Sequence, residues 1–74
     1  MAALTGPVFR SYADAEREAD ARAQRAGVQY SVVEDMYAAP LFVVVRRTSA
    51  EAALEENFDR WEIQYTSGPY TEEA

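Results

Sequence analysis

Carboxylates are the side chains that this sequence gathers most densely. Four of them lie close together after the middle of the chain: Glu51, Glu55, Glu56 and Asp59. On a helix, residues four apart are neighbours, so Glu55 would lie next to both Glu51 and Asp59. Such a group could hold a hard cation or supply the acid and base for cleaving a sugar. Because runs of acids on a helix usually form a solvated face, we expect no metal site here, and a chain of 74 residues has no room for the sugar cleft of a glycosidase.

The residue types on which most enzymes depend are missing. The sequence has no His, no Cys and no Lys. It therefore lacks the usual general base, thiolate nucleophile, Schiff-base amine and nitrogen or sulfur metal ligands. The three glycines, Gly6, Gly27 and Gly68, are isolated and form no phosphate-binding loop. We predict a protein that is not an enzyme and that uses no cofactor.

Charge is distributed unevenly along the chain. Up to residue 50, six acids balance six arginines, whereas residues 51–74 contain seven acids and a single arginine. The whole formal net charge of −6 therefore lies in the last third. A field of this sign repels nucleic-acid backbones and attracts basic surfaces. We predict a protein partner with a basic surface and no direct contact with nucleic acid.

The strands that would position these side chains can be predicted from hydropathy. Residues 41–47 are apolar on both alternating faces and predict a buried central strand. Alternation predicts further strands over residues 28–34 and 60–66, and residues 7–10 could form a short first strand that begins at a proline. A long loop before the central strand would expose Met36 and Tyr37 as possible contacts.

Two helices are predicted between these strands. Ser11 is a suitable N-cap for a first helix that Gly27 ends, and the apolar face of this helix is almost wholly alanine. Thr48 with Glu51 three residues later predicts the N-cap of a second, short helix. The apolar stripe of the second helix would consist of Ala50, Ala53, Leu54 and Phe58.

The resulting order is strand, helix, strand, strand, helix, strand, within a single α+β domain over residues 1–74 that has loose ends at 1–6 and 70–74. This order is typical of the ferredoxin-like split βαβ arrangement, a four-stranded, mostly antiparallel sheet with two helices on one face. A three-stranded α+β domain is the alternative if the first strand or second helix does not form. The other face of a four-stranded sheet would be open around Phe42 and Val44.

Size and composition also predict where the protein is found. A chain of 74 residues buries only about 60% of the surface that its unfolded form exposes, which leaves a homodimer possible. No apolar run approaches the roughly 20 residues of a membrane span, and the N-terminus does not have the pattern of a secretion signal. With no cysteine, the sequence predicts a cytoplasmic protein without membrane contact.

Two resemblances bear on function. The element order and the helix that ends at Gly27 before Val28, Gln29 and Tyr30 resemble SPOR-type peptidoglycan-binding domains in arrangement, without a shared residue motif. In size, acidity and lack of cysteine, the chain is similar to phage-encoded inhibitors, including anti-CRISPR proteins, many of which mimic nucleic acid. The second resemblance implies a protein that occupies the nucleic-acid-binding groove of a partner.

Two functions follow as hypotheses. The first is an inhibitor that docks an acidic surface into a basic nucleic-acid-binding groove of a partner protein. The alternative is a structural or regulatory subunit that dimerises or docks through the open sheet face. For the first hypothesis, the predicted partner contacts are Glu34, Asp35, Tyr37, Glu51, Glu55, Glu56, Asp59 and Glu62.

Overall fold

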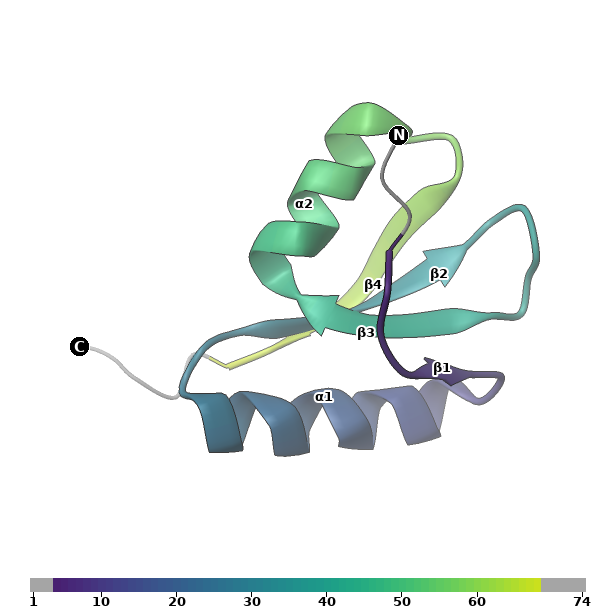
Figure 1. The fold of residues 1–74 in the computed structure, drawn as a ribbon. Helices are drawn as coiled ribbons and strands as arrows, with labels where there is room; N and C mark the ends of the chain where they lie inside the picture. The colour runs from purple at the N-terminus through teal and green to yellow at the C-terminus, as the bar shows by residue number, and fades with distance from the viewer. Residues whose placement is uncertain (1–3, 69–74) are drawn as a thin grey trace.

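The computed structural model describes residues 4–68 and contains four strands and two helices in the predicted order (Figure 1). The strands pair antiparallel in the order β1-β3-β2-β4, which confirms the α+β class and the four-stranded antiparallel sheet. The predicted ends at residues 1–3 and 70–74 lie outside the described residues. The elements are β1 (Val8–Phe9), α1 (Tyr12–Ala26), β2 (Tyr30–Asp35), β3 (Phe42–Arg46), α2 (Arg47–Glu56) and β4 (Trp61–Ser67).

Both ends of α1 are specified by the sequence. Ser11 has an extended backbone, and its hydroxyl accepts a hydrogen bond from the backbone N–H of Asp14 at 3.3 Å. Gly27 takes a left-handed conformation, with φ of 73°, and donates its N–H to the Ala23 carbonyl at 2.8 Å. The fully buried residues of α1 are Ala15, Ala19 and Ala23. Because these side chains are small, the helix backbone can lie close to the sheet.

The start of α2 differs from the prediction. Its first residue is Arg47, and the N-cap is Arg46, whose side chain makes no capping hydrogen bond. Thr48 lies inside the first turn because β3 continues directly into the helix, and the Arg47 N–H still bonds to the Gln29 carbonyl of the sheet at 3.0 Å. The helix ends before Phe58, which is 75% exposed and takes no part in the apolar stripe.

The two helices cover opposite faces of the sheet (Figure 1). Successive residues of β3 belong to different cores, because strand side chains alternate between faces. Phe42 and Val44 pack in the core under α1, whereas Val43 and Val45 pack in the core under α2. The prediction that both helices share one face is therefore wrong. The predicted open face does not exist either, since Phe42 and Val44 are buried.

The position of β4 explains this difference. In a ferredoxin-like sheet the last strand lies beside β1, but here β4 lies beside β2. The strand β1 is only two residues long and offers β4 a short edge, whereas β2 pairs with β4 at six positions. Connections between parallel strands of a sheet are right-handed. Because β3 runs antiparallel to β1 and both connections step in the same direction across the sheet, α2 reaches the face opposite to α1.

A β-bulge lets β4 contribute to both cores. Val32 pairs with Tyr65 but the next residue, Val33, pairs with Ile63, so Gln64 is the extra residue of the strand. The extra residue reverses the alternation of side chains. Ile63 therefore packs in the core under α2, whereas Tyr65 packs in the core under α1.

Beyond the bulge, β4 is tied to α1 by one carboxylate. The Tyr65 hydroxyl and the Ser67 hydroxyl both donate to the same oxygen of Asp20, each at 2.7 Å. The hydrogen bond to Asp20, together with burial, raises the pKa of Tyr65 to about 12. This contact fixes the edge strand of the sheet to the helix on that face.

The chain before β1 also packs on the sheet. Leu4 contacts the core under α2. Gly6 lies so close to β3 that a Cβ atom there would be 2.4 Å from the Val44 carbonyl oxygen. Residues 4–6 were predicted to belong to a loose end, but here they cross the edge of the sheet in contact with it.

Candidate functional site

The carboxylates of α2 do not form one row. Glu56 lines a groove between the helix and the N-terminal segment. At 100° per residue, Glu51 and Glu55 point away from that groove, and both are exposed. Glu51 forms an ion pair with Arg47 at 3.6 Å. Glu55 therefore differs from the other two: it lies in the last turn of the helix, on the side away from the groove.

The charges of α2 oppose its helix dipole. Anionic side chains stabilise a helix near its N-terminus and cationic ones near its C-terminus. In α2 the first turn contains no acid and the last turn contains no base. Instead, Arg47 begins the helix and Glu55 and Glu56 end it. Stability of the helix therefore does not account for the placement of these charges.

The turn after β2 and the turn between α2 and β4 meet at one end of the sheet. The backbone N–H of Met36, just after β2, donates to the Arg60 carbonyl, just before β4, at 2.6 Å. Three large apolar side chains are exposed in these turns: Met36 at 45%, Tyr37 at 66% and Phe58 at 75%. Exposed aromatic side chains of this kind are frequent anchors in protein interfaces.

Acidic side chains lie in these turns or within a few residues of them. Glu55 precedes the turn and Asp59 lies within it, and both are exposed. Glu34 and Glu62 lie opposite each other on β2 and β4, an unfavourable pairing of like charges that the Gln64 side chain relieves by donating to Glu34 at 2.9 Å. We call the whole surface the acidic end; it consists of Glu34, Met36, Tyr37, Glu55, Phe58, Asp59 and Glu62.

Asp35 is part of the framework of this surface. Its carboxylate is 4% exposed and accepts two hydrogen bonds from the Arg60 guanidinium, at 3.1 and 3.0 Å, and one from the Tyr37 N–H at 3.0 Å. The bonds from Arg60 hold the pKa of Asp35 below its usual value. The guanidinium also lies over the Trp61 ring, 4.4 Å from its centroid. Asp35 therefore shapes the loop instead of facing a partner.

The structure separates the eight predicted contact residues into groups. Five lie at the acidic end, while Glu51 lies about one turn earlier on α2, Glu56 faces the groove, and Asp35 is buried. Of the apolar residues at the acidic end, Phe58 was not predicted as a contact, and Met36 was expected only as a possible contact beside Tyr37. Met36 was expected to be exposed in its loop, but Phe58 has the spacing of a core residue of α2, which concealed its exposure.

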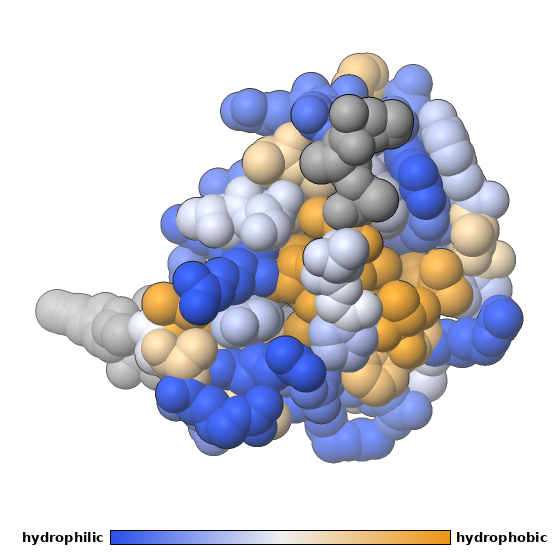
Figure 2. Space-filling model, viewed as in Figure 1, coloured by the Kyte–Doolittle hydropathy of each residue, from blue (hydrophilic) through white to orange (hydrophobic). Residues whose placement is uncertain are grey.

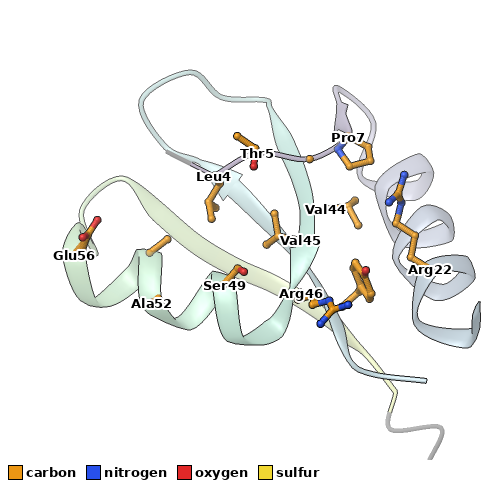
Figure 3. Close-up of a pocket in the computed structure, with 13 residues that line it drawn as sticks. Leu4, Thr5, Pro7, Arg22, Val44, Val45, Arg46, Ser49, Ala52 and Glu56 are labelled. Carbon is orange, nitrogen blue, oxygen red and sulfur yellow. The ribbon is translucent and has the colours of Figure 1, made fainter. Parts of the chain in front are cut away.

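The groove itself was not predicted from the sequence (Figure 3). It has a volume of about 420 Å³ and runs along the edge of β3 between α1, α2 and the N-terminal segment. Figure 2 shows apolar side chains gathered between the polar outer surfaces of the two helices. Two arginines, Arg22 and Arg46, also line it. The adjacent Gly6 and Pro7 were the available signal, because proline ends a ladder of sheet hydrogen bonds.

Three further findings complete the description. Within residues 4–68, no cluster of three or more acidic, histidine or cysteine side chains is placed to hold a metal ion. No helix in that range is both long enough and apolar enough to cross a membrane. Comparison of the chain with protein-family models, with curated proteins and with solved structures found no match.

Proposed function

We propose that this protein is a non-enzymatic inhibitor that acts in the cytoplasm and places its acidic end in a basic groove of a nucleic-acid-binding protein. The surface would act as a mimic of a nucleic-acid backbone, as in the anti-CRISPR proteins that the composition resembles. The observation that carries this proposal is the joining of exposed apolar and acidic side chains at one end of the sheet. Such a surface combines anchors with charge complementarity.

Solubility alone explains this arrangement less well. Dispersed acids would serve solubility equally, and large exposed apolar side chains work against it. Here Phe58 is 75% exposed directly beside Asp59, and Tyr37 is 66% exposed on a loop fixed by Asp35. The reversed charges of α2 point the same way, since Glu55 opposes the helix dipole in which it lies. A basic partner would relieve that repulsion.

The proposal can be tested by isolating the partner and then measuring displacement. Tagged protein is incubated with host lysate at low salt, and proteins released at high salt are identified and purified. Each is bound to a labelled DNA duplex or RNA, and unlabelled inhibitor is added while fluorescence anisotropy is followed. We expect the nucleic acid to be displaced, and the displacement to weaken as salt is raised. A partner that retains its nucleic acid at saturating inhibitor would contradict the proposal.

Charge reversal provides matched variants for this assay. The double variant Glu55→Arg with Asp59→Arg should weaken displacement by about tenfold or more. The triple variant Ala13→Arg, Glu16→Arg and Gln24→Arg on α1 also changes the net charge by four but leaves the acidic end intact, and should displace like the wild type. Phe58→Ala should weaken displacement without altering stability, because its side chain is largely exposed. Equal losses in the double and triple variants would show that only net charge matters.

A further inference from the structure

The hydrogen-bond ladder on the outer edge of β3 ends early. The two residues of β1 pair with only the first two residues of β3. The last backbone bond that the structure gives on this edge runs from the Val44 N–H to the Pro7 carbonyl, at 3.0 Å. Proline has no N–H to return a bond to Val44, and Gly6 lies against the Val44 carbonyl. The part of the edge after Val44 has no strand beside it in the described residues.

The N–H of Arg46 faces this open edge. Alternate residues of a strand direct their backbone N–H groups to the same side, so Arg46 points as Val44 does. The next residue, Arg47, directs its N–H to the other side of β3, where it bonds to the Gln29 carbonyl, as this alternation requires. The Arg46 carbonyl belongs to the N-cap of α2, where it accepts the first helical bond. The donor is thus the group available to an added strand.

The groove beside this edge has two chemically different walls. On the α1 face lies the basic wall, formed by Arg22, Tyr30 and Arg46. The Nε of Arg22 forms an ion pair with Glu18 at 2.6 Å, whereas Arg46 has no ion-pair partner among the described residues. On the α2 face lies the apolar wall, which is formed by Leu4, Val45, Ala52 and Ala53, with the polar side chains of Ser49 and Glu56 on the same side (Figure 3).

We propose that the free edge of β3 binds an extended acidic peptide from a partner protein. The added strand would accept a hydrogen bond from the Arg46 N–H. Because successive side chains of a strand point to opposite sides, one residue would place its carboxylate against the basic wall and the next would place an apolar side chain against the apolar wall. At the basic wall, the unpaired Arg46 beside Arg22 selects an acidic residue over a basic one, while Glu56 lies on the opposite side of the groove, where the ligand would place its apolar side chain. The recognised pattern is acidic and apolar residues in alternation.

This site is independent of the acidic end. Arg46 lies at the end of β3, whereas the acidic end adjoins the start of that strand, where Phe42 pairs with Glu34. The basic wall of the groove and the acidic end also have opposite charge, so they select different partners. A protein with both could bind a basic groove and an acidic peptide at the same time.

Synthetic peptides test the predicted pattern. The probe is a fluorescein-labelled hexapeptide of alternating valine and glutamate, titrated with the whole protein by fluorescence anisotropy. A peptide with the same composition in two blocks, and one of alternating valine and lysine, are the controls. We expect the alternating acidic peptide to bind and both controls to bind at least about tenfold more weakly. Equal binding of the block peptide would overturn the proposed strand addition.

Variants of the groove separate its two walls. Arg22→Gln and Arg46→Glu should each weaken the alternating peptide by about tenfold or more, because they remove the cationic partners of its carboxylates. Arg25→Gln, exposed on α1 outside the groove, is the matched control and should bind normally. Ala52→Phe should block the apolar wall while leaving circular dichroism unchanged, since Ala52 is exposed. Normal binding by all three groove variants would refute the site.

Two further readouts identify the mode of binding and the occupant. Strand addition should slow hydrogen exchange of the Arg46 amide when the peptide binds; unchanged exchange would contradict it. Sedimentation should give a monomer in the absence of peptide. A concentration-dependent dimer that Ala52→Phe dissociates would show that a second copy of the chain occupies the edge, and would overturn the proposal.

Discussion

The two helices pack on the same sheet but differ in how their ends are built. On one face, α1 has a serine N-cap, an acid in its first turn, a base in its last turn and a glycine that ends it. On the other face, α2 has an uncapped N-terminus and lacks both the acid and the base in those turns. Each of the features present in α1 contributes a few tenths to about 1 kcal/mol.

This difference indicates what determined each surface. The residues at the two ends of α1, from Ser11 and Asp14 to Arg25 and Gly27, are accounted for by the stability of the helix. The residues of α2 are not, because Arg46 occupies the N-cap where a short polar residue would stabilise the helix, and Glu55 occupies a position that favours a base. Both residues belong to the proposed binding surfaces. Substitutions that make the helices more alike should therefore change stability and binding in opposite directions.

The largest change in stability should come from enlarging a buried residue of α1 that faces the sheet. Ala19 is completely buried against the sheet, so Ala19→Leu would force the helix and sheet apart and destabilise the protein by about 3 kcal/mol. Urea unfolding followed by circular dichroism measures this change. Ala26→Leu, at the exposed end of the same helix, should have almost no effect. A loss below about 0.5 kcal/mol for Ala19→Leu would show that the interface is loosely packed.

The contact between α1 and β4 should depend on alkaline pH. The raised pKa of Tyr65 means that the folded protein favours the neutral phenol. Its contribution to stability is therefore complete below about pH 10 and is lost as the pH rises through about 12. Tyr65→Phe should remove this dependence and destabilise the protein at neutral pH by roughly 1.5 kcal/mol.

Unfolding at a series of pH values, together with tyrosinate absorbance, tests the role of Tyr65. Tyr37→Phe is the control, since the Tyr37 side chain is exposed and the loss of its hydroxyl should leave stability nearly unchanged. Burial also raises the pKa of Tyr12, so a part of the alkaline loss should remain in Tyr65→Phe, but a loss as large as in the wild type would assign the titration to another group.

Installing a cap on α2 should stabilise the protein. Arg46→Asp places a carboxylate at an N-cap whose backbone is already extended, and should raise the free energy of unfolding by about 1 kcal/mol. The same change should abolish binding of the alternating acidic peptide. Arg46→Ala removes the charge without adding a cap, so it should weaken peptide binding without this gain. A destabilised Arg46→Asp would show that Arg46 supports the fold.

The smallest expected effect is at the other end of α2. Glu55→Lys places a favourable charge in the last turn and should stabilise the protein by about 0.4 kcal/mol, while weakening displacement of nucleic acid from the partner. Thermal unfolding at low salt measures the gain. Glu55→Gln should show a smaller gain. If displacement were unchanged in Glu55→Lys, this residue would lie outside the partner contact.

Local signals predicted the elements of the fold, and long-range pairing decided their arrangement. Ser11 and Gly27 correctly predict both ends of α1, and alternation predicts β2, β3 and most of β4. The apolar residues on both sides of β3 also contained evidence for cover on both faces, because Phe42 and Val43 could not both be buried under one layer of helices. The choice of β2 as the neighbour of β4 left no local signal.

The site was predicted less completely than the fold. The exposed acids Glu55 and Asp59 were identified from charge alone. The burial of Asp35 could not be, because its partner Arg60 lies 25 residues away and is brought near only by the pairing of β2 with β4. The groove likewise depends on where the pairing of β1 with β3 ends. A sequence contains no direct record of a strand edge that is left open.

The bulge at Gln64 also bears on how the protein unfolds. Two thin cores on opposite faces of a sheet could melt separately, each with its own helix. Here Ile63 lies in one core and Tyr65, two residues on, lies in the other, so loosening either core disturbs the strand that closes the second. Because successive residues of β2 and β3 also belong to different cores, the three strands link the two layers, and we expect the protein to unfold in one transition.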